Sequence, residues 1–145
     1  MTHPSSDRQL DPGLVSRLIT DQFPDFRDRQ ARYLGAGWDH DLFVVGGDWV
    51  FRFSKRAERV PWLVREIGII RIMNQTLGSL VPHFEYIGKP CDTFPYPFVG
   101  YRQLPGLGAD QSPLRDPGGL AEDIGHLLSR IHRVDAHGIP PTPVG

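Results

Sequence analysis

An arginine within a strand-like run of aromatic residues is the first candidate for chemistry in this sequence. Trp49, Phe51 and Phe53 recur at every second position, with Arg52 between the last two. A period of two places the aromatic side chains on one face of a strand and Arg52 on the other. A half-buried guanidinium must find an anion, and Glu66 in the helical stretch that follows can supply one. The pattern therefore predicts an ion pair between Arg52 and Glu66.

A basic cluster surrounds this arginine. Residues 50–71 hold six arginines or lysines against two glutamates. Such a surplus suits a polyanionic ligand, whereas Lys55, Arg56 and Arg59 are more simply explained as solvated loop charge. The six histidines and the single cysteine show no metal-ligand spacing, so no metal site is predicted.

The elements that would position these residues follow from hydrophobic periodicity and turn residues. Residues 1–10 are expected to form a frayed tail. The predicted helices begin at Asp11-Pro12, Pro61 and Asp116-Pro117, and they end before Pro24, at Gly78 and at Gly138. The predicted strands are residues 28–35, 42–45, 49–53, 81–88 and 98–104, with Gly46-Gly47 as a two-residue hairpin turn. This order predicts an α+β fold in which a five-stranded antiparallel sheet packs against the 62–77 helix.

Composition narrows the class of protein. The chain has 145 residues, of which 39% are hydrophobic and 23% charged, as in an ordinary globular domain. The net charge of −1 argues against partners such as nucleic acid or a membrane surface. Cys91 is the single cysteine, which excludes an internal disulfide and suits a reducing compartment. The polar amino terminus lacks the apolar segment of a signal peptide, and no apolar run has membrane-spanning length. A cytoplasmic protein is therefore expected.

The order of these elements resembles the amino-terminal lobe and hinge of the aminoglycoside phosphotransferase family, which has a protein-kinase-like fold. The stretches that carry the resemblance are GAGWDHDLFVV, WVFRF, REIGIIRIM, VPHFEYIGKP, FPYPFVGYRQLPG and LLSRIHRVD. They cover roughly residues 30–135, and their order and spacing carry more weight than any one of them.

The resemblance implies a nucleotide site. Gly35 and Gly37 match the loop that covers the nucleotide phosphates, where backbone amides must approach the anion closely; a plain hairpin turn explains the same glycines. Arg52 matches the strand lysine that contacts the phosphates, and its permanent charge and fork suit polyphosphate. Glu66 matches the helix glutamate that orients this residue, with an ordinary surface pair as the alternative. His40 stands where relatives carry a small polar residue, and a solvent-exposed loop histidine is expected.

The resemblance also implies a site for the adenine base. Leu42 and Val50 would form an apolar roof over the base, although either could belong to the core. Tyr101 falls at the gatekeeper position, ahead of a hinge in which the carbonyl of Arg102 and the amide of Leu104 would bond adenine. An edge strand running into a linker is the alternative for this segment.

The family's chemistry needs residues that this sequence lacks. A kinase uses a catalytic aspartate, and an asparagine and a second aspartate to hold magnesium. Neither Asp135 nor His137-Gly138 stands in a matching motif, so no catalytic residue is predicted here. The expected organisation is a nucleotide-binding lobe over residues 1–106, followed over 107–145 by a hinge linker and the first helix of a truncated carboxy-terminal lobe.

The sequence therefore predicts the ATP- or GTP-binding half of a phosphotransferase, inactive alone, whose complete form acts on a hydroxyl of an aminoglycoside-like antibiotic or related metabolite. Mg²⁺ is expected only with the missing lobe. The alternative is a non-catalytic nucleotide-binding or protein-interaction module. The apolar stripe of Leu120, Ile124, Leu127 and Ile131 would be short of partners, so self-association or instability through residues 120–131 is expected.

Overall fold

A computed structural model describes residues 6–107, 111, 116–135, 137–139 and 141. Its centre is a five-stranded antiparallel sheet in the order β1-β2-β3-β5-β4, as predicted. The strands are β1 (Ala31–Ala36), β2 (His40–Val45), β3 (Trp49–Ser54), β4 (Tyr86–Gly88) and β5 (Phe98–Arg102).

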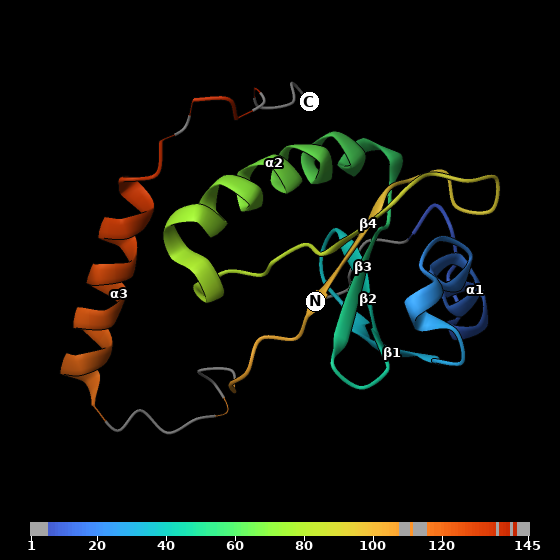
Figure 1. Ribbon diagram of the computed structural model, residues 1–145, viewed down its shortest axis with the longest axis horizontal. Coiled ribbons are helices and arrows are strands. Elements are labelled where there is room, and N and C mark those ends of the chain that lie inside the picture. The colour runs from blue at the N-terminus through green and yellow to red at the C-terminus, as the bar shows by residue number, and fades with distance from the viewer. Residues whose placement is uncertain (1–5, 108–110, 112–115, 136, 140, 142–145) are drawn as a thin grey trace.

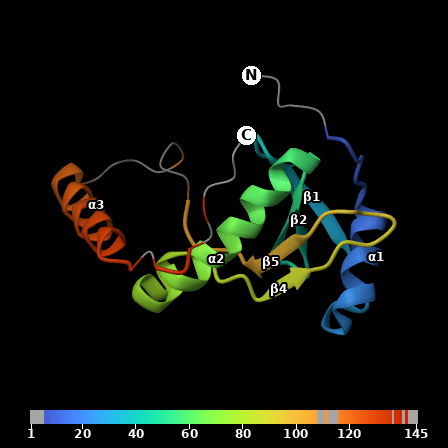
Figure 2. The same cartoon turned by 90° about the horizontal axis from the view of Figure 1, so that it is seen from above.

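Two helices cover opposite faces of this sheet, and a third stands apart. Helices α1 (Pro12–Gln22) and α2 (Val60–Leu77) lie on either side of the strands, whereas α3 (Pro117–His132) lies beside one end of α2 (Figures 1 and 2). Short 3-10 helices are η1 (Pro24–Phe26), η2 (Ala57–Arg59) and η3 (Gly78–Leu80). No helix in the described part of the chain is long and apolar enough to cross a membrane.

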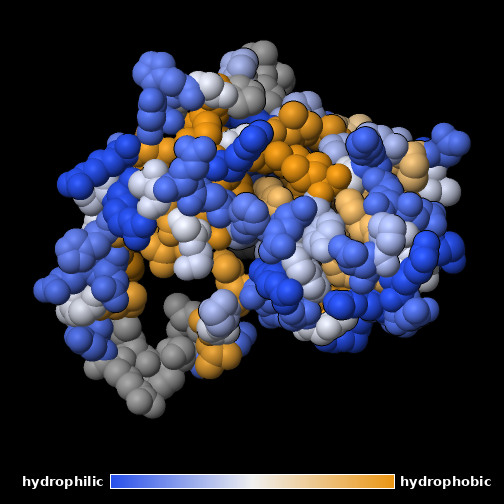
Figure 3. All heavy atoms as spheres, viewed as in Figure 1, coloured by the Kyte–Doolittle hydropathy of each residue, from blue (hydrophilic) through white to orange (hydrophobic). Residues whose placement is uncertain are grey.

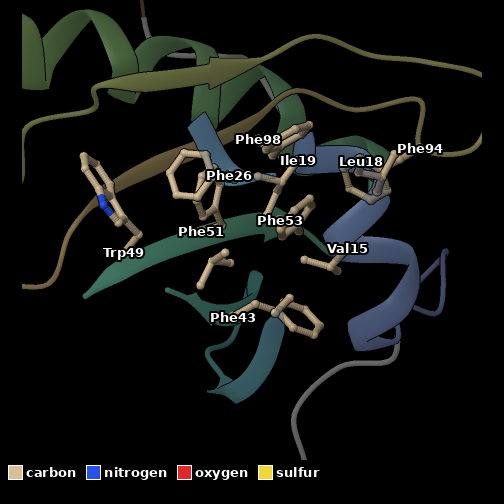
Figure 4. Packing of buried hydrophobic residues seen from close by; sticks show 12 residues of the cluster. Val15, Leu18, Ile19, Phe26, Phe43, Trp49, Phe51, Phe53, Phe94 and Phe98 are labelled. Atoms are coloured by element: carbon tan, nitrogen blue, oxygen red, sulfur yellow. The ribbon is translucent and has the colours of Figure 1, made fainter. Parts of the chain in front are cut away.

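The aromatic face of β3 packs against α1. Phe51 and Phe53 are fully buried beside Val15 and Ile19 of α1 (Figure 4). Each such side chain contributes about 1.5–3 kcal/mol when it leaves water. This face is therefore the hydrophobic core, and α1 is its cover.

The hairpin between β2 and β3 differs from prediction in the size of its turn. Val45 pairs with Trp49, which leaves a three-residue loop of Gly46, Gly47 and Asp48. The two glycines take φ values of 65° and 94°, which glycine adopts without steric cost. The prediction of a two-residue turn was wrong, while the antiparallel pairing that it implied is confirmed.

Other element boundaries shift for local reasons. β1 begins at Ala31 because Asp28 takes a φ of 67°, which interrupts an extended strand. β4 is shorter than predicted because the preceding residues bond to α2, where the Asn74 amide donates to the Pro82 carbonyl at 3.1 Å. Likewise, β5 ends at Arg102, short of the predicted residue 104.

The end of α3 also falls earlier than predicted. The helix stops at His132 instead of continuing to Gly138. Beyond it, the Asp135 carboxylate accepts a hydrogen bond from the His137 amide at 2.9 Å. Such a local side-chain contact competes with helical backbone bonding.

The amino-terminal segment is docked, so the prediction of a frayed tail was wrong for residues 6–10. The Asp7 amide donates to the Lys55 carbonyl at 2.7 Å, and the Asp7 carboxylate accepts from the Ala57 amide at 2.9 Å. The Ser6 hydroxyl donates to Asp41 at 2.9 Å. Residues 1–5 of the predicted tail lie outside the described residues.

Both edge strands of the sheet depart from a regular, extended form. The register between β1 and β2 shifts between Tyr33 and Gly35, which marks a bulge at that edge. At the other edge, β4 has three residues and is followed by Lys89-Pro90.

Helix α3 presents an apolar stripe with little cover. No residue in this helix is buried, and Leu120, Ile124 and Leu128 are 42%, 47% and 47% exposed. The Arg130 guanidinium donates to the Thr76 carbonyl at the end of α2. Hydrophobic surface gathers over α2 and along the side of α3 that faces it (Figure 3). Leu120 and Ile124 are thus short of partners within the described residues, as expected, whereas Leu127 and Ile131 of the predicted stripe are half-buried.

Candidate functional site

Arg52 of β3 and Glu66 of α2 form a two-point ion pair. The distance from Nη1 to Oε1 is 3.1 Å and that from Nη2 to Oε2 is 2.5 Å. The side chains are 16% and 35% exposed, so the pair is partly screened from water. The guanidinium also lies 5.5 Å from the ring centre of Phe84, within range of a cation–π contact. The predicted contact is confirmed.

The fork of Arg52 keeps capacity for a further anion. A guanidinium carries five N–H donors, and the hydrogen bonds to Glu66 use one on each terminal nitrogen. The Nε–H is buried and has no hydrogen-bond partner among the described residues. An arginine held in this way is suited to bind a phosphate group at its remaining donors.

The register of the sheet places other predicted residues on the face of Arg52. Residues paired across antiparallel strands point to the same face. Leu42 pairs with both Arg52 and Gly35, while Val50, two residues from Arg52, pairs with Tyr101. Val50 is buried, and Leu42 and Tyr101 are half-buried. These five residues therefore share the face that is opposite the aromatic core.

The turn between β1 and β2 does not itself require its glycines. Neither Gly35 nor Gly37 takes a positive φ. A Cβ added at Gly35 would meet nothing within 4 Å among the described residues, and one at Gly37 would lie 3.7 Å from the His40 carbonyl oxygen. The Gly37 amide donates to that same carbonyl at 2.8 Å. The backbone here is thus open to close approach by a ligand, with the Gly37 amide already engaged.

The predicted hinge follows β5. The Gln103 amide donates to the Asp48 carbonyl at 2.8 Å, which makes Trp49 and Arg102 a non-hydrogen-bonded pair. The backbone N–H and C=O of Arg102 therefore point away from β3. The Arg102 side chain pairs with Asp48 and lies 4.5 Å from the Trp49 ring centre, away from Arg52. Leu104 lies beyond the strand and is 42% exposed.

His40 occupies the same face as Arg52, and the expectation of a solvent-exposed loop histidine was wrong. Its Nε2 atom is buried and has no hydrogen-bond partner among the described residues. It lines a cavity of about 250 Å³ together with Glu66 and Trp62. Burial, followed by the charge of Arg52, lowers the pKa of His40 to about 4. Extending the strand alternation two residues back from Leu42 would have placed His40 on this face.

Burial of Tyr101 is the main cause of a pKa raised above the ordinary value for tyrosine. The nearby Arg52 acts in the opposite direction. The ring centre of Tyr101 lies 5.7 Å from that of Phe84, the aromatic residue that also contacts Arg52. Tyr101 thus presents a neutral, partly buried ring next to the charged pair.

The basic residues after β3 are not solvated loop charge, so that interpretation was wrong. Lys55 is 3% exposed and its Nζ lies 3.7 Å from Asp41 Oδ1. Arg56 and Arg59 pair with Asp39 at 2.9 and 3.1 Å. Asp39 and Asp41 belong to the β1–β2 turn and β2, which only the folded hairpin brings close, whereas Glu58, 3.2 Å from Arg56, is a local partner.

The residues present do not fit a magnesium ion. No group of three or more His, Cys, Asp or Glu within the described ranges could hold a metal. Phosphoryl transfer by kinases uses Mg²⁺ held by carboxylate and amide oxygens. Such ligands are not gathered around Arg52 in the described part of the chain.

Comparison with known proteins identifies the family of this chain. A model of the phosphotransferase enzyme family matches residues 30–143, which is most of the chain. The chain belongs to this phosphotransferase family. No curated protein sequence matched it.

Solved structures agree with the fold of this phosphotransferase-family chain. It is similar to the GDP and kanamycin complex of APH(2")-IIia, with a TM-score of 0.71 and 29% identity over 84% of this chain and 42% of that chain. It is similar to the GDP complex of wild-type aminoglycoside 2'-phosphotransferase-IIIa, with a TM-score of 0.70 and 27% identity over 89% of this chain and 43% of that chain. The phosphotransferase-family chain thus spans less than half the length of these structures. The predicted resemblance to an amino-terminal kinase-like lobe is confirmed.

A more distant likeness supports the fold alone. The streptomycin-ATP-APH(2")-IIa ternary complex has a TM-score of 0.63 and 21% identity over 88% of this chain and 41% of that chain.

Proposed function

We propose that this chain is the nucleotide-binding part of an enzyme that transfers the γ-phosphoryl group of ATP or GTP to a hydroxyl of a small molecule. The observation that carries this proposal is the two-point Arg52–Glu66 pair on the sheet face shared by Leu42, Val50 and Tyr101. Two of the similar solved structures are GDP complexes, which supports a nucleotide as the ligand.

In the proposed complex, Arg52 binds the phosphates through donors that Glu66 does not engage. Gly35 and Gly37 bring the backbone of the β1–β2 turn close to the same phosphates, and the open space beside Gly35 supports this role. Glu66 fixes the direction of the guanidinium. These residues contribute by positioning and by charge stabilisation.

The base lies between the sheet and the hinge in this proposal. Leu42 and Val50 cover its face, and Tyr101 borders it. The carbonyl of Arg102 and the amide of Leu104 bond its edge. The orientation of the Arg102 backbone groups away from β3 supports this contact.

We assign residues 1–106 to the nucleotide-binding lobe and residues 107–145 to the hinge linker and the first helix of a second lobe. The catalytic base, the Mg²⁺ ligands and the acceptor pocket are placed in that second lobe. An aminoglycoside-like antibiotic or related metabolite is the proposed acceptor, since one similar structure contains kanamycin. The chain alone is accordingly expected to show no turnover.

Calorimetric titration of the 145-residue chain with ATP and GTP tests the proposal. Arg52→Gln keeps the size of the side chain but removes its charge, and it should weaken binding about 10- to 100-fold, the usual effect of losing a charged hydrogen bond. Arg71→Gln is the matched control, because Arg71 is exposed on α2. A wild-type chain that binds neither nucleotide at millimolar concentration would overturn the proposal.

A non-catalytic nucleotide-binding or protein-interaction module is the second candidate, and the exposed stripe of α3 favours it. Both candidates expect no ATP turnover by this chain alone, so the gene sequence downstream of the codon for residue 145 separates them: an in-frame catalytic loop would support the enzyme, and an immediate stop codon would support the module. Turnover by this chain would exclude the module and would place the chemistry within these 145 residues.

A further inference from the structure

The chain has two lysines in opposite environments. Lys89 is exposed, whereas Lys55 is 3% exposed. An ammonium group removed from water must be compensated by hydrogen bonds and an opposite charge. The position of Lys55 therefore requires specific partners.

The partners of Lys55 belong to the glycine turn, which we define as residues 35–39. Its Nζ donates to the Gly37 carbonyl at 3.0 Å and lies 3.7 Å from Asp41 Oδ1. Its backbone amide donates to the Asp39 carbonyl at 2.9 Å. Lys55 thus bonds the turn at two carbonyls, and Asp41 balances its charge.

The amino-terminal segment holds this lysine and its counter-ion from the other side. The Asp7 amide donates to the Lys55 carbonyl at 2.7 Å. The Ser6 hydroxyl donates to Asp41 Oδ2 at 2.9 Å. Because the amino-terminal segment holds both the Lys55 backbone and the Asp41 carboxylate, the ammonium group has little freedom to leave the turn.

The Lys55 side chain reaches the glycine turn from the aromatic face of the sheet. Asp41 pairs with Phe53 and therefore lies on the aromatic face of the sheet. The salt bridge to Asp41 places the Lys55 ammonium on that side, opposite the face of Arg52. Lys55 is consequently not directed at the proposed phosphate position and can act only through the turn.

We infer that Lys55 is a positioning residue that holds the glycine turn in the conformation that binds the phosphates of a nucleotide. This inference rests on the proposed function. The turn has open space beside Gly35, so the contact with Lys55 supplies a restraint that side-chain packing there does not. A turn restrained in advance loses less conformational freedom when a ligand binds.

The test compares ATP with adenosine, which lacks phosphates, by calorimetry on the full chain. Lys55→Met keeps the length of the side chain and removes its charge. ATP should bind about tenfold more weakly to this variant, because the preorganisation of the phosphate contacts is lost. Adenosine affinity should stay unchanged, and Lys89→Met should leave both affinities unchanged.

Two calorimetric results would overturn the inference. One is an unchanged affinity of Lys55→Met for ATP. The other is an equal loss for ATP and adenosine, which would indicate general damage to the lobe. Since Lys55→Met removes the counter-charge of the Asp41 carboxylate, which is 15% exposed, the double variant K55M/D41N provides a second measurement. It should show the same selective loss of ATP affinity.

Hydrogen exchange separates this inference from the proposed function. The Gly37 amide donates to the His40 carbonyl, and the Lys55 amide donates to the Asp39 carbonyl. The exchange of both amides can be followed without nucleotide. Both should exchange about tenfold faster in Lys55→Met if the restraint is real, and unchanged rates would overturn it. Faster exchange in a protein whose wild type binds no nucleotide would overturn only the proposed function, leaving Lys55 as the residue that holds the turn.

Discussion

At the scale of single residues, His40 couples the stability of this lobe to pH. Its pKa is lowered from the ordinary value of 6.5 to about 4 by burial and by Arg52, and the nearby Glu66, Asp39 and Asp41 oppose this only in part. Between these values the unfolded chain binds a proton on this ring that the folded chain does not. The free energy of unfolding should therefore decrease as the pH falls from about 6.5 to about 4. The contribution of His40 is fully present above that range.

Urea denaturation at about pH 7 and about pH 5 measures this coupling. His40→Asn removes the titrating ring, so the loss of stability between the two pH values should be smaller than in the wild type. His126→Asn replaces an exposed histidine of α3 and should keep the wild-type dependence. An unaltered pH dependence in His40→Asn would contradict the assignment.

Residues with local signals could be predicted, and residues defined by distant contacts could not. The alternation around Arg52 and the need of a half-buried guanidinium for an anion, together with the resemblance to the family's strand–helix pair, predicted its contact with Glu66. Lys55 carries no such signal, since its partners on the β1–β2 hairpin and the docked segment at Ser6 and Asp7 meet it only after folding. Whether a charged side chain is buried depends on tertiary structure, and the composition of its loop does not predict it.

At the scale of elements, close packing between β5 and β3 depends on a glycine. A Cβ at Gly100 would lie 2.5 Å from an edge carbon of the Phe51 ring, and Phe51 is fully buried. Gly100→Ala should therefore destabilise the fold by about 1–3 kcal/mol, as expected for overpacking of a core. Thermal denaturation should show a lower midpoint.

Gly125→Ala is the matched control for that substitution. Gly125 lies in α3, and a Cβ there would meet nothing within 4 Å among the described residues. Alanine favours a helix over glycine by up to about 1 kcal/mol, so this variant should be neutral or slightly more stable. Equal destabilisation of the two variants would contradict the packing argument.

Starts of helices could be predicted better than lengths of strands. Asp11 and Asp116 cap their helices through bonds to amides three residues away, at 2.9 and 3.0 Å, and such caps are visible in the local sequence. The limits of β4 and the size of the loop at residues 46–48 depend instead on which strand or helix the backbone groups find as partners. These partners are distant in the sequence, so a short sequence window does not predict them.

At the scale of the whole molecule, the exposed stripe of α3 predicts association. Leu120, Ile124 and Leu128 are 42–47% exposed, and burying one such side chain contributes about 1.5–3 kcal/mol. Light scattering of the purified chain should show a concentration-dependent mass above that of a monomer. Ile124→Glu places a charge in the stripe and should shift the chain toward the monomer.

Ser129→Glu adds the same charge to an exposed position on the opposite side of α3 and should not change the mass. A wild-type chain that stays strictly monomeric at high concentration would contradict this prediction. It would instead favour a complete binding module.

The bulged and shortened edges of the sheet limit what such an assembly can become. β1 carries an irregular register between Tyr33 and Gly35, and β4 ends after three residues at Gly88, followed by Lys89-Pro90. Bulges, charges, prolines and short lengths each discourage a strand of another molecule from pairing with an open edge. Copies of this protein should therefore not extend their sheets into one another. Contacts through α3 should give small, finite oligomers, and the amyloid-like fibres that grow by strand addition should be absent even from concentrated samples.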